Sequence, residues 1–500
     1  MTAGRSVVLG VDLGTSAIKV VAVGADGTVH AVARRGYPTA RPEPLAAEQD
    51  PRDWFVALEA ALDEVAGTVP VASWAGIGLS AMLPTLVECD DSGRPQAPAV
   101  TWEDARAQPD ADALCAAVGD DVLYRLTGQR VDGRYLAPMH MRMHRLGCAG
   151  ALVAAAKDVV FAHLTGEVLT DPSTAAGFAA YHIENGTWIA EVVAKAGLSR
   201  LPAVAPAATS RPLLAAWCDR WALPPGFPVV LGAADSVLGA VGVGAARPGE
   251  VAVIAGTSAI VIGISDAPTR DRQRRYLVTP LAGAGWGLEM DVLAMGSAFE
   301  GIAGLLGSTP AALLDDAAAV PRDDAPVFLP YVTPGEQGAL WDPSLTGTLH
   351  GLRLGMTAGH IGRALLTGVV VELRRCIDVL EETTGRRGPV LLGGGAVSPV
   401  MCRDIADATG REVRVDPNVR DHSAVGAALF AAESLGVSIA LSDGAVRVEP
   451  DADAYGWWTD CLSRHDALRS ALAGVGVTKT TVDGPMSGHL AVADRPVDWQ

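Results

Sequence analysis

The sequence predicts an α/β protein made of two similar halves with a cleft between them. Its main support is a five-residue string, Gly-Thr-Ser-Ala-Ile, which occurs at residues 14–18 and again at residues 256–260. Each copy lies between two β-branched apolar runs, a pattern typical of two strands joined by a tight turn. Helical patterns follow both copies, and 500 residues exceed what one core usually supports. We therefore expect a duplicated fold of two domains.

Composition indicates a globular chain and excludes two kinds of partner. Hydrophobic residues make up 49% of the chain and charged residues 19%, which argues against extensive disorder. The formal net charge is −18 and no long Lys/Arg run occurs, so neither nucleic acid nor a membrane surface is an expected partner. The first residues resemble no signal peptide and no segment approaches a transmembrane length. We expect a cytoplasmic protein.

Cysteine and histidine spacing gives no sign of a metal site. The seven cysteines are scattered without a C-x-x-C pair and are expected to be reduced core residues. His140 and His144 are four residues apart, but they lack the Glu of the H-E-x-x-H arrangement. No zinc site is predicted.

The first half is expected to begin with a three-stranded meander over residues 7–33. A helix over residues 50–65 follows, and residues 110–208 are expected to be mostly helical, including a helix over residues 151–164. The other predicted elements are strands over 74–80 and 85–89, a strand over 227–234 and a helix over 237–244.

A turn at residues 247–250 is the expected domain boundary. It divides the chain into an N-terminal domain of residues 1–246, a C-terminal domain of residues 247–474, and a poorly ordered tail of residues 475–500. After the second meander, the predicted elements are strands over 276–280 and 287–293, a helix over 357–380, a strand and glycine turn over 389–396, and a helix over 402–409.

The two repeated turns are suited to phosphate. Glycine permits positive φ and lets a bulky ligand approach the backbone, while Thr and Ser add hydroxyls to exposed N–H groups. A Rossmann fingerprint or a P-loop would place a helix after the glycines, whereas here a second strand follows. Chance similarity between two turns of a glycine-rich chain stays an alternative.

Eight short motifs occur in the order in which FGGY-type carbohydrate kinases carry them, and from Val7 to about Ala473 the chain resembles this family, which includes xylulokinase and glycerol kinase. The motifs are Asp12-Leu13-Gly14-Thr15-Ser16-Ala17-Ile18-Lys19, Trp102-Glu103-Asp104-Ala105-Arg106, Leu164-Thr165-Gly166-Glu167, Gly232-Ala233-Ala234-Asp235, Ala255-Gly256-Thr257-Ser258, Phe328-Leu329-Pro330-Tyr331 with Gly335-Glu336, Asp342-Pro343, and Gly393-Gly394-Gly395-Ala396. The resemblance implies two actin-like (ribonuclease H-like) ATPase domains. It also implies ATP-dependent phosphorylation of a hydroxyl of a small sugar, sugar acid or polyol.

Phosphoryl transfer depends on charge neutralisation, an in-line hydroxyl and a proton acceptor. Asp235 resembles the family's general base, and its alternative role is to cap the following helix. Asp12 is expected to organise Mg²⁺, because a carboxylate beside phosphates needs an intervening cation, and its alternative role is a turn cap. Lys19 is expected to reach phosphate, and its alternative is a solvated strand residue.

The resemblance also implies a set of nucleotide-binding residues. For Gly296, placed near the ribose, a simple packing role is an equal alternative. The set comprises Gly14, Thr15, Ser16, Lys19, Gly256, Thr257, Gly296, Gly394, Gly395 and Ala396.

The expected substrate-binding residues depart from the xylulokinase pattern in two places. Met82 and Leu83, followed by Pro84, stand where xylulokinases carry a Gln-Met-His-Gly string, so the substrate-binding histidine is missing and D-xylulose itself is doubtful. The family's lysine is absent near residues 139–141, and Tyr135 aligns with a polyol contact of glycerol kinases. The expected set is Met82, Leu83, Trp102, Asp104, Arg106, Tyr135 and Asp235.

Two other functions compete with a kinase. An actin-fold ATPase acting as a chaperone or filament would need the phosphate turns but no small-molecule base such as Asp235. A non-catalytic sugar- or nucleotide-binding relative would keep the fold without turnover. The sequence leaves a homodimeric assembly open.

Overall fold

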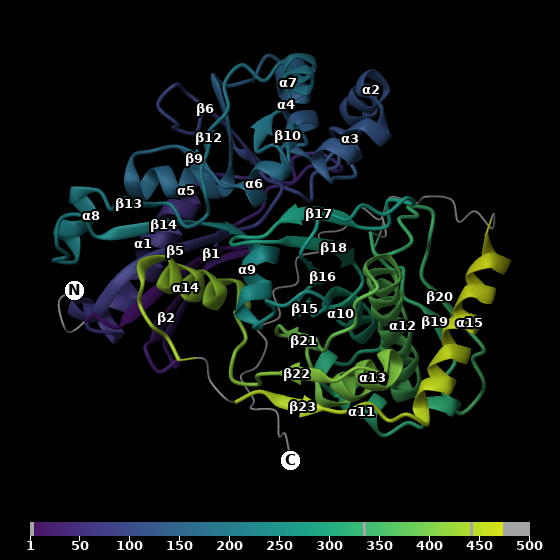
Figure 1. Ribbon diagram of the computed structural model, residues 1–500. Coiled ribbons are helices and arrows are strands. Elements are labelled where there is room, and N and C mark those ends of the chain that lie inside the picture. Colours follow the sequence, from purple (N-terminus) through teal and green to yellow (C-terminus); the bar gives the residue numbers. More distant parts are fainter. Residues whose placement is uncertain (1–4, 334–336, 441–443, 474–500) are drawn as a thin grey trace. The chain divides into compact units, whose positions relative to one another are not determined.

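In the computed structural model, which describes residues 5–333, 337–440 and 444–473, the chain forms two compact units (Figure 1). Unit 1 comprises residues 1–254, 262–289 and 416–445, and unit 2 comprises the three segments between and after them. The first three limits fall inside β15, β16 and β18, whereas the sequence suggested one boundary between residues 246 and 247. The predicted tail of residues 475–500 lies outside the described residues.

Unit 1 is built on a six-stranded sheet with strand order β13-β14-β5-β1-β2-β3. The predicted meander is confirmed, because β1 pairs antiparallel with β2, and β2 with β3. β1 also pairs in parallel with β5, and β5 with β14. The strands are β1 (Val7–Leu13), β2 (Ala17–Gly24), β3 (Val29–Gly36), β5 (Trp74–Ala81), β13 (Ser210–Pro212) and β14 (Pro228–Ala234).

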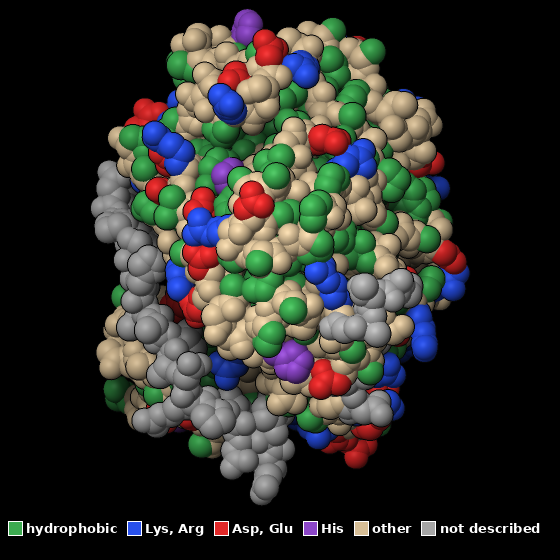
Figure 2. Space-filling view, turned by 90° about the vertical axis from the view of Figure 1, so that its left-hand side faces the viewer, with side chains coloured by type: hydrophobic (Ala, Val, Ile, Leu, Met, Phe, Trp, Pro, Cys, Tyr) green, Lys and Arg blue, Asp and Glu red, His purple; other side chains and the backbone are tan. Residues whose placement is uncertain are grey.

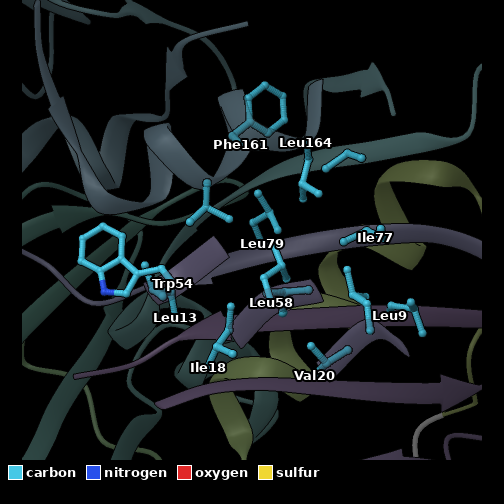
Figure 3. Packing of buried hydrophobic residues seen from close by; sticks show 14 of the residues in the cluster. Leu9, Leu13, Ile18, Val20, Trp54, Leu58, Ile77, Leu79, Phe161 and Leu164 are labelled. Atoms are coloured by element: carbon cyan, nitrogen blue, oxygen red, sulfur yellow. The ribbon is translucent and has the colours of Figure 1, made fainter. Parts of the chain in front are cut away.

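Both faces of this sheet are covered, which explains why its central strands are continuous apolar runs. On one face, Trp54 and Leu58 of helix α1 (Pro51–Thr68) pack against β1 and β2, while Phe161 of helix α5 (Ala156–Thr165) packs in the same buried cluster (Figure 3). On the other face lie α9 (Asp235–Gly242) and α14 (His422–Leu435).

Helix α14 comes from late in the chain but packs in unit 1. Its backbone approaches the sheet so closely that a Cβ on Gly10 would lie 1.8 Å from the carbonyl oxygen of Ala424, and one on Gly78 would lie 2.2 Å from that of Ala427. The strands carry glycine at these positions because no other residue leaves room for the helix.

A second layer of unit 1 contains a four-stranded sheet of order β4-β7-β6-β8. The helix predicted over residues 151–164 is wrong at its start, because residues 152–155 form β8 and pair with β6, and the helix begins at Ala156. Up to residue 246, the strands and α-helices of unit 1 not yet named are β4 (Glu48–Gln49), β6 (Leu86–Cys89), β7 (Ala99–Val100), β8 (Leu152–Ala155), β9 (Leu169–Thr170), β10 (Tyr181–His182), β11 (Thr187–Trp188), β12 (Ala203–Val204), α2 (Gln108–Val118), α3 (Asp120–Thr127), α4 (Leu136–Arg145), α6 (Pro172–Ala176), α7 (Ala190–Ala196) and α8 (Ala215–Arg220).

The second repeat is strand, turn, strand as predicted, formed by β15 (Val251–Ala255) and β16 (Ala259–Ser265). Strands β17 (Leu277–Pro280) and β18 (Trp286–Val292) then pair antiparallel. In unit 2, β21 pairs in parallel with β22, and β22 antiparallel with β23. Its elements are α10 (Gly296–Leu305), α11 (Pro310–Ala318), β19 (Val327–Leu329), β20 (Thr348–His350), α12 (Ala358–Thr384), β21 (Val390–Gly393), α13 (Pro399–Thr409), β22 (Val413–Val415), β23 (Val446–Val448) and α15 (Ala454–Leu472).

Three expectations from the composition concern charged side chains, membrane-spanning helices and cysteines. Acidic and basic side chains lie close to one another on the face shown in Figure 2. No helix within the described part of the chain combines the length and the apolar character that crossing a bilayer requires. All seven cysteines are free thiols, as expected, but Cys148 is exposed and Cys115 only partly buried, so the expectation of core positions is wrong for these two.

Candidate active site

The first repeated turn joins β1 to β2 and is held by backbone and side-chain hydrogen bonds, among them one from the Tyr37 amide to the Ser16 carbonyl at 3.2 Å. The Gly14 amide donates to the carbonyl of Ala17 at 3.1 Å, and the Tyr37 hydroxyl donates to the Gly14 carbonyl. Gln49 Nε2 donates to the Thr15 carbonyl at 2.7 Å, and the indole N–H of Trp102 donates to Thr15 Oγ1 at 2.9 Å. Trp102, predicted to bind substrate, therefore contacts the predicted phosphate turn directly.

The positive φ expected for this turn is wrong. Neither Gly14 nor Gly256 has a φ in the left-handed region, and each turn closes through a backbone hydrogen bond that its glycine donates, to Ala17 or to Ser258. A Cβ on Gly256 would have its nearest neighbour at 3.7 Å, and one on Gly14 at 3.3 Å. Neither the backbone conformation nor the packing around Gly256 requires glycine.

Asp12 lies at the end of β1 and is buried, with 4% of its surface exposed. The register of β1 and β5 places it beside Ser80, whose hydroxyl donates to Asp12 Oδ1 at 2.9 Å. Its Oδ2 lies 3.7 Å from where a Cβ on Gly14 would stand. Burial raises the pKa of Asp12, and the charge of Lys19 acts against this. The side chain thus faces the phosphate turn.

Lys19 lies opposite Asp12 in the β1–β2 register and forms an ion pair with Asp421 at 3.1 Å. Burial lowers the pKa of the Lys19 ammonium, but the carboxylates of Asp12 and Asp421 raise it above its usual value. Asp421 immediately precedes helix α14, and no sequence signal pointed to it as a partner of Lys19. Direct contact between Lys19 and phosphate stays a prediction.

Asp235 is the first residue of α9 and directly follows β14. It is half-buried, and its Oδ1 accepts a hydrogen bond from the Ser236 amide at 2.9 Å. The N-cap position belongs to Ala234, so Asp235 is not the cap of this helix, which begins two residues before the predicted start. The carboxylate lies at the carboxyl end of a sheet strand, where α/β folds commonly bind ligands.

A buried polar network that the sequence analysis missed supports the strand end before Asp235. Ser173 Oγ accepts a hydrogen bond from the Ala234 amide at 3.0 Å and donates to Asp171 at 2.5 Å. Asp171 caps α6 and pairs with Lys157, which is only 2% exposed, at 3.1 Å. The string Asp171-Pro172-Ser173-Thr174 is a helix-start signal that could have placed the cap.

Asp104 and Arg106, predicted to bind substrate, lie in an internal ion-pair network. Asp104 is buried and accepts from the Ala47 amide at 3.0 Å and from Arg106 Nε at 2.9 Å. Arg106 also pairs with Glu43 at 2.7 Å and with Glu48 at 2.5 Å. Although burial lowers the pKa of Arg106, these carboxylates raise it above its usual value. Direct substrate contacts by this pair stay a prediction.

The remaining predicted substrate residues are largely buried. Met82 belongs to the sheet core, and the side chain of Leu83 lies where a Cβ on Gly177 would stand. The Tyr135 hydroxyl donates to Gln129 Oε1 at 3.0 Å. Residues 139–141 stand where the family carries a lysine, and among them His140 is buried, with its Nδ1 2.7 Å from Glu88 Oε1.

The predicted nucleotide-binding residues of unit 2 lie together. The Gly296 amide at the start of α10 donates to the Gly256 carbonyl at 3.0 Å, and the Ser297 amide donates to the Thr257 carbonyl at 3.0 Å. A Cβ on Gly296 would lie 2.5 Å from the Gly256 carbonyl oxygen, which favours the packing explanation for this glycine.

The glycine turn after β21 contacts the same place. Gly394 has φ of 109°, and its Cβ position lies 2.1 Å from the Ala255 carbonyl oxygen, which also accepts from the Ala396 amide at 3.1 Å. Gly395 has open space around it. Among the other motifs, Tyr331 donates to Glu372 at 2.9 Å, and Gly335 and Glu336 lie outside the described residues.

Comparisons with known proteins agree with this arrangement. The N-terminal domain of the FGGY family of carbohydrate kinases matches residues 7–242, and its C-terminal domain matches residues 251–435. The chain is 28% identical to a xylulose kinase of Klebsiella pneumoniae, over 86% of this chain and 90% of that protein. It is 27% identical to a gluconokinase of Bacillus subtilis, over 85% and 87%.

A solved structure shows the same fold. The gluconate kinase from Lactobacillus acidophilus superimposes with a TM-score of 0.85 at 22% identity, covering 94% of this chain and 98% of that one. The two family matches, together with the shared fold, define a phosphotransferase that acts on an alcohol group. The chain belongs to the FGGY family of carbohydrate kinases, which use ATP to phosphorylate a hydroxyl of a sugar or sugar acid.

Proposed function

We propose that Asp235 is the general base that takes the proton of the acceptor hydroxyl during phosphoryl transfer. The observation that carries this proposal is its position, half-buried at the carboxyl end of β14 with its backbone fixed on both sides. Ser173 holds the Ala234 amide, and Ser423 Oγ donates to the Asp235 carbonyl at 3.0 Å. A proton acceptor must be positioned within hydrogen-bond reach of the reacting hydroxyl, and a fixed backbone supplies that positioning.

Asp12 is proposed to hold Mg²⁺, directly or through water. The described residues contain no group of three or more His, Cys, Asp or Glu side chains that could hold a metal. A single buried carboxylate beside the phosphate turn nevertheless fits Mg²⁺, which keeps several waters and takes one or two carboxylates together with phosphate oxygens. When bound, the ion neutralises charge on the phosphates. Ser80 fixes one oxygen of Asp12 and leaves the other directed toward Gly14.

The two repeated turns are proposed to bind the phosphates of ATP through their backbone amides and hydroxyls. In the first turn Gly14 and Thr15 are partly exposed and Ser16 is exposed, and in the second turn Gly256 and Thr257 are exposed. Successive backbone N–H groups in such turns form anion-binding concavities. The residues 394–396 and the start of α10 are proposed to border the nucleoside in unit 2.

The acceptor is proposed to be a small sugar or polyol with a less polar end than D-xylulose. Met82 and Leu83 offer no hydrogen bond to a sugar hydroxyl, and a site discriminates most strongly where a polar group would be left unpaired. Trp102 is proposed to link the acceptor site to the first phosphate turn through its bond to Thr15.

The experiment is an assay of ADP release with a panel of ketoses, polyols and aldonates. We expect turnover with at least one neutral acceptor and a specificity constant for D-xylulose below the best in the panel. ATP binding without ADP release with any acceptor would instead favour a non-catalytic relative. A homodimer, which the sequence left open, is tested by light scattering of the same preparation.

A further inference from the structure

A second carboxylate, that of Glu289 on β18, lies beside the proposed base. Thr279 Oγ1 on the paired strand β17 donates to Glu289 Oε2 at 3.1 Å, and the side chain of Ser236 forms another hydrogen bond with Glu289. Ser236 is the residue next to Asp235 and holds it through its amide. One serine therefore contacts both carboxylates, and all of these residues belong to unit 1.

The same hairpin is fixed to the segment that carries Tyr135. Gln129 Nε2 donates to the Val278 carbonyl at 3.1 Å, and the Tyr135 hydroxyl donates to Gln129 Oε1 at 3.0 Å. Burial raises the pKa of Tyr135, and Glu289 is close enough to raise it further. The hairpin thus brings Glu289 to the two residues, Asp235 and Tyr135, that are proposed to meet the acceptor.

Glu289 is a carboxyl group without a cationic partner among the described residues. Across the described ranges, no Lys or Arg side chain forms an ion pair with it, whereas Asp104 and Asp171 are each paired with a cation. Burial raises the pKa of Glu289, but the hydroxyls of Ser236 and Thr279 stabilise its ionised form. With its ionised form held by these two hydroxyls, Glu289 would add a second negative charge beside Asp235 that no described Lys or Arg neutralises.

We propose that Glu289 makes the enzyme select neutral acceptors, sugars or polyols, over sugar acids. This inference rests on the proposed function, because it requires the acceptor to bind beside Asp235. A carboxylate on the acceptor would be repelled by Glu289 and by Asp235, and like charges at several ångströms in a partly buried site reduce binding by about tenfold to a hundredfold. The relatives named above include both a xylulose kinase and a gluconokinase, so the family alone does not decide between the two acceptor classes.

The test compares acceptors that share a carbon skeleton, namely xylitol with D-xylonate and D-glucitol with D-gluconate. Specificity constants are measured by ADP release for the wild type, Glu289→Gln and Glu289→Met. Glu88→Gln is the matched control, because Glu88 is also a buried Glu of unit 1 but is bound to His140 and the Gly150 amide. A purely structural Glu289 would lower the specificity constant for both members of a pair equally.

We expect the wild type to prefer the neutral member of each pair. Both Glu289 variants should raise the acid-to-neutral ratio by about tenfold or more, and Glu88→Gln should leave it unchanged. Wild-type preference for the acids, or an unchanged ratio in both folded Glu289 variants, would overturn the inference. The Asp235→Asn variant distinguishes failure of the proposed base from failure of the proposed selectivity. Full activity in Asp235→Asn contradicts the role of Asp235 as the base. Lost activity in Asp235→Asn, together with an unchanged acid-to-neutral ratio in the Glu289 variants, contradicts only the selectivity.

Discussion

Replacing Gly256 with alanine should weaken ATP binding without destabilising the fold. The nearest protein atom to the new Cβ is the Ser258 carbonyl oxygen at 3.7 Å, an ordinary van der Waals contact, and the φ of Gly256 lies outside the left-handed region. Gly→Ala at a compatible position changes the free energy of unfolding by about 0.4 to 1 kcal/mol, in the stabilising direction. A phosphate held against the backbone would lose its contact, which predicts a Kd for ATP raised by about tenfold or more.

Gly394→Ala is the opposite case and serves as the comparison. Its φ of 109° is disfavoured for alanine, and the new Cβ would lie 2.1 Å from the Ala255 carbonyl oxygen. We expect a loss of at least about 2 kcal/mol of stability from strain and overpacking. Urea denaturation measures both stabilities, and calorimetric titration with ATP measures both affinities. Gly256→Ala with wild-type ATP affinity, or with a large loss of stability, would refute the reasoning about the turn.

The remaining predictions concern the metal, a buried ion pair and acid stability. Chelation of Mg²⁺ by EDTA should abolish ADP release, and added Mg²⁺ should restore it. The Asp12→Asn variant should need a higher Mg²⁺ concentration for its half-maximal rate. Turnover in the presence of EDTA would exclude the metal role. Lys157→Met should lower the free energy of unfolding by about 3 to 5 kcal/mol, because it leaves the buried Asp171 carboxylate without its cation. A smaller change, measured by urea denaturation, would mean that water enters the site and solvates the carboxylate. Burial lowers the pKa of His163 to about 4, so the unfolded chain binds a proton there more readily between pH 6.5 and 4. The contribution of neutral His163 to the free energy of unfolding is fully present above pH 6.5 and is smaller by about 2 kcal/mol at pH 5. The free energy of unfolding of His163→Phe, measured at pH 7 and pH 5, should therefore fall less than that of the wild type. An equal fall in the variant would contradict the assignment.

The sequence was sufficient for the elements whose signal is local. The two strand-turn-strand repeats were predicted correctly because their apolar runs and glycine turns are contiguous, and the positions of Asp12 near the end of β1 and of Asp235 directly after β14 follow from the same local signal. The positive φ expected at Gly14 was wrong, since the identity of a turn residue does not determine how the turn closes. The helix predicted from residue 151 was wrong at its start because β8 pairs with β6, a partner distant in the chain.

Interactions between distant segments could not be predicted. The pairing of Lys19 with Asp421 joins residues about four hundred positions apart and depends on α14 packing against the first sheet. Gly10 and Gly78 carried a partial signal, because glycine inside a strand often marks a close approach of another backbone. That signal shows that something packs there, but not which segment of the chain supplies it.

Steady-state and binding measurements on Asp235→Asn test the central claim most directly. The asparagine keeps an oxygen that can accept the Ser236 amide at the present 2.9 Å, so the fold and the helix start should persist. With the best acceptor of the panel, ADP release should fall by about two to four decades while the Kd for ATP stays near the wild-type value. Wild-type turnover in this variant would contradict the assignment of Asp235 as the base that accepts the hydroxyl proton.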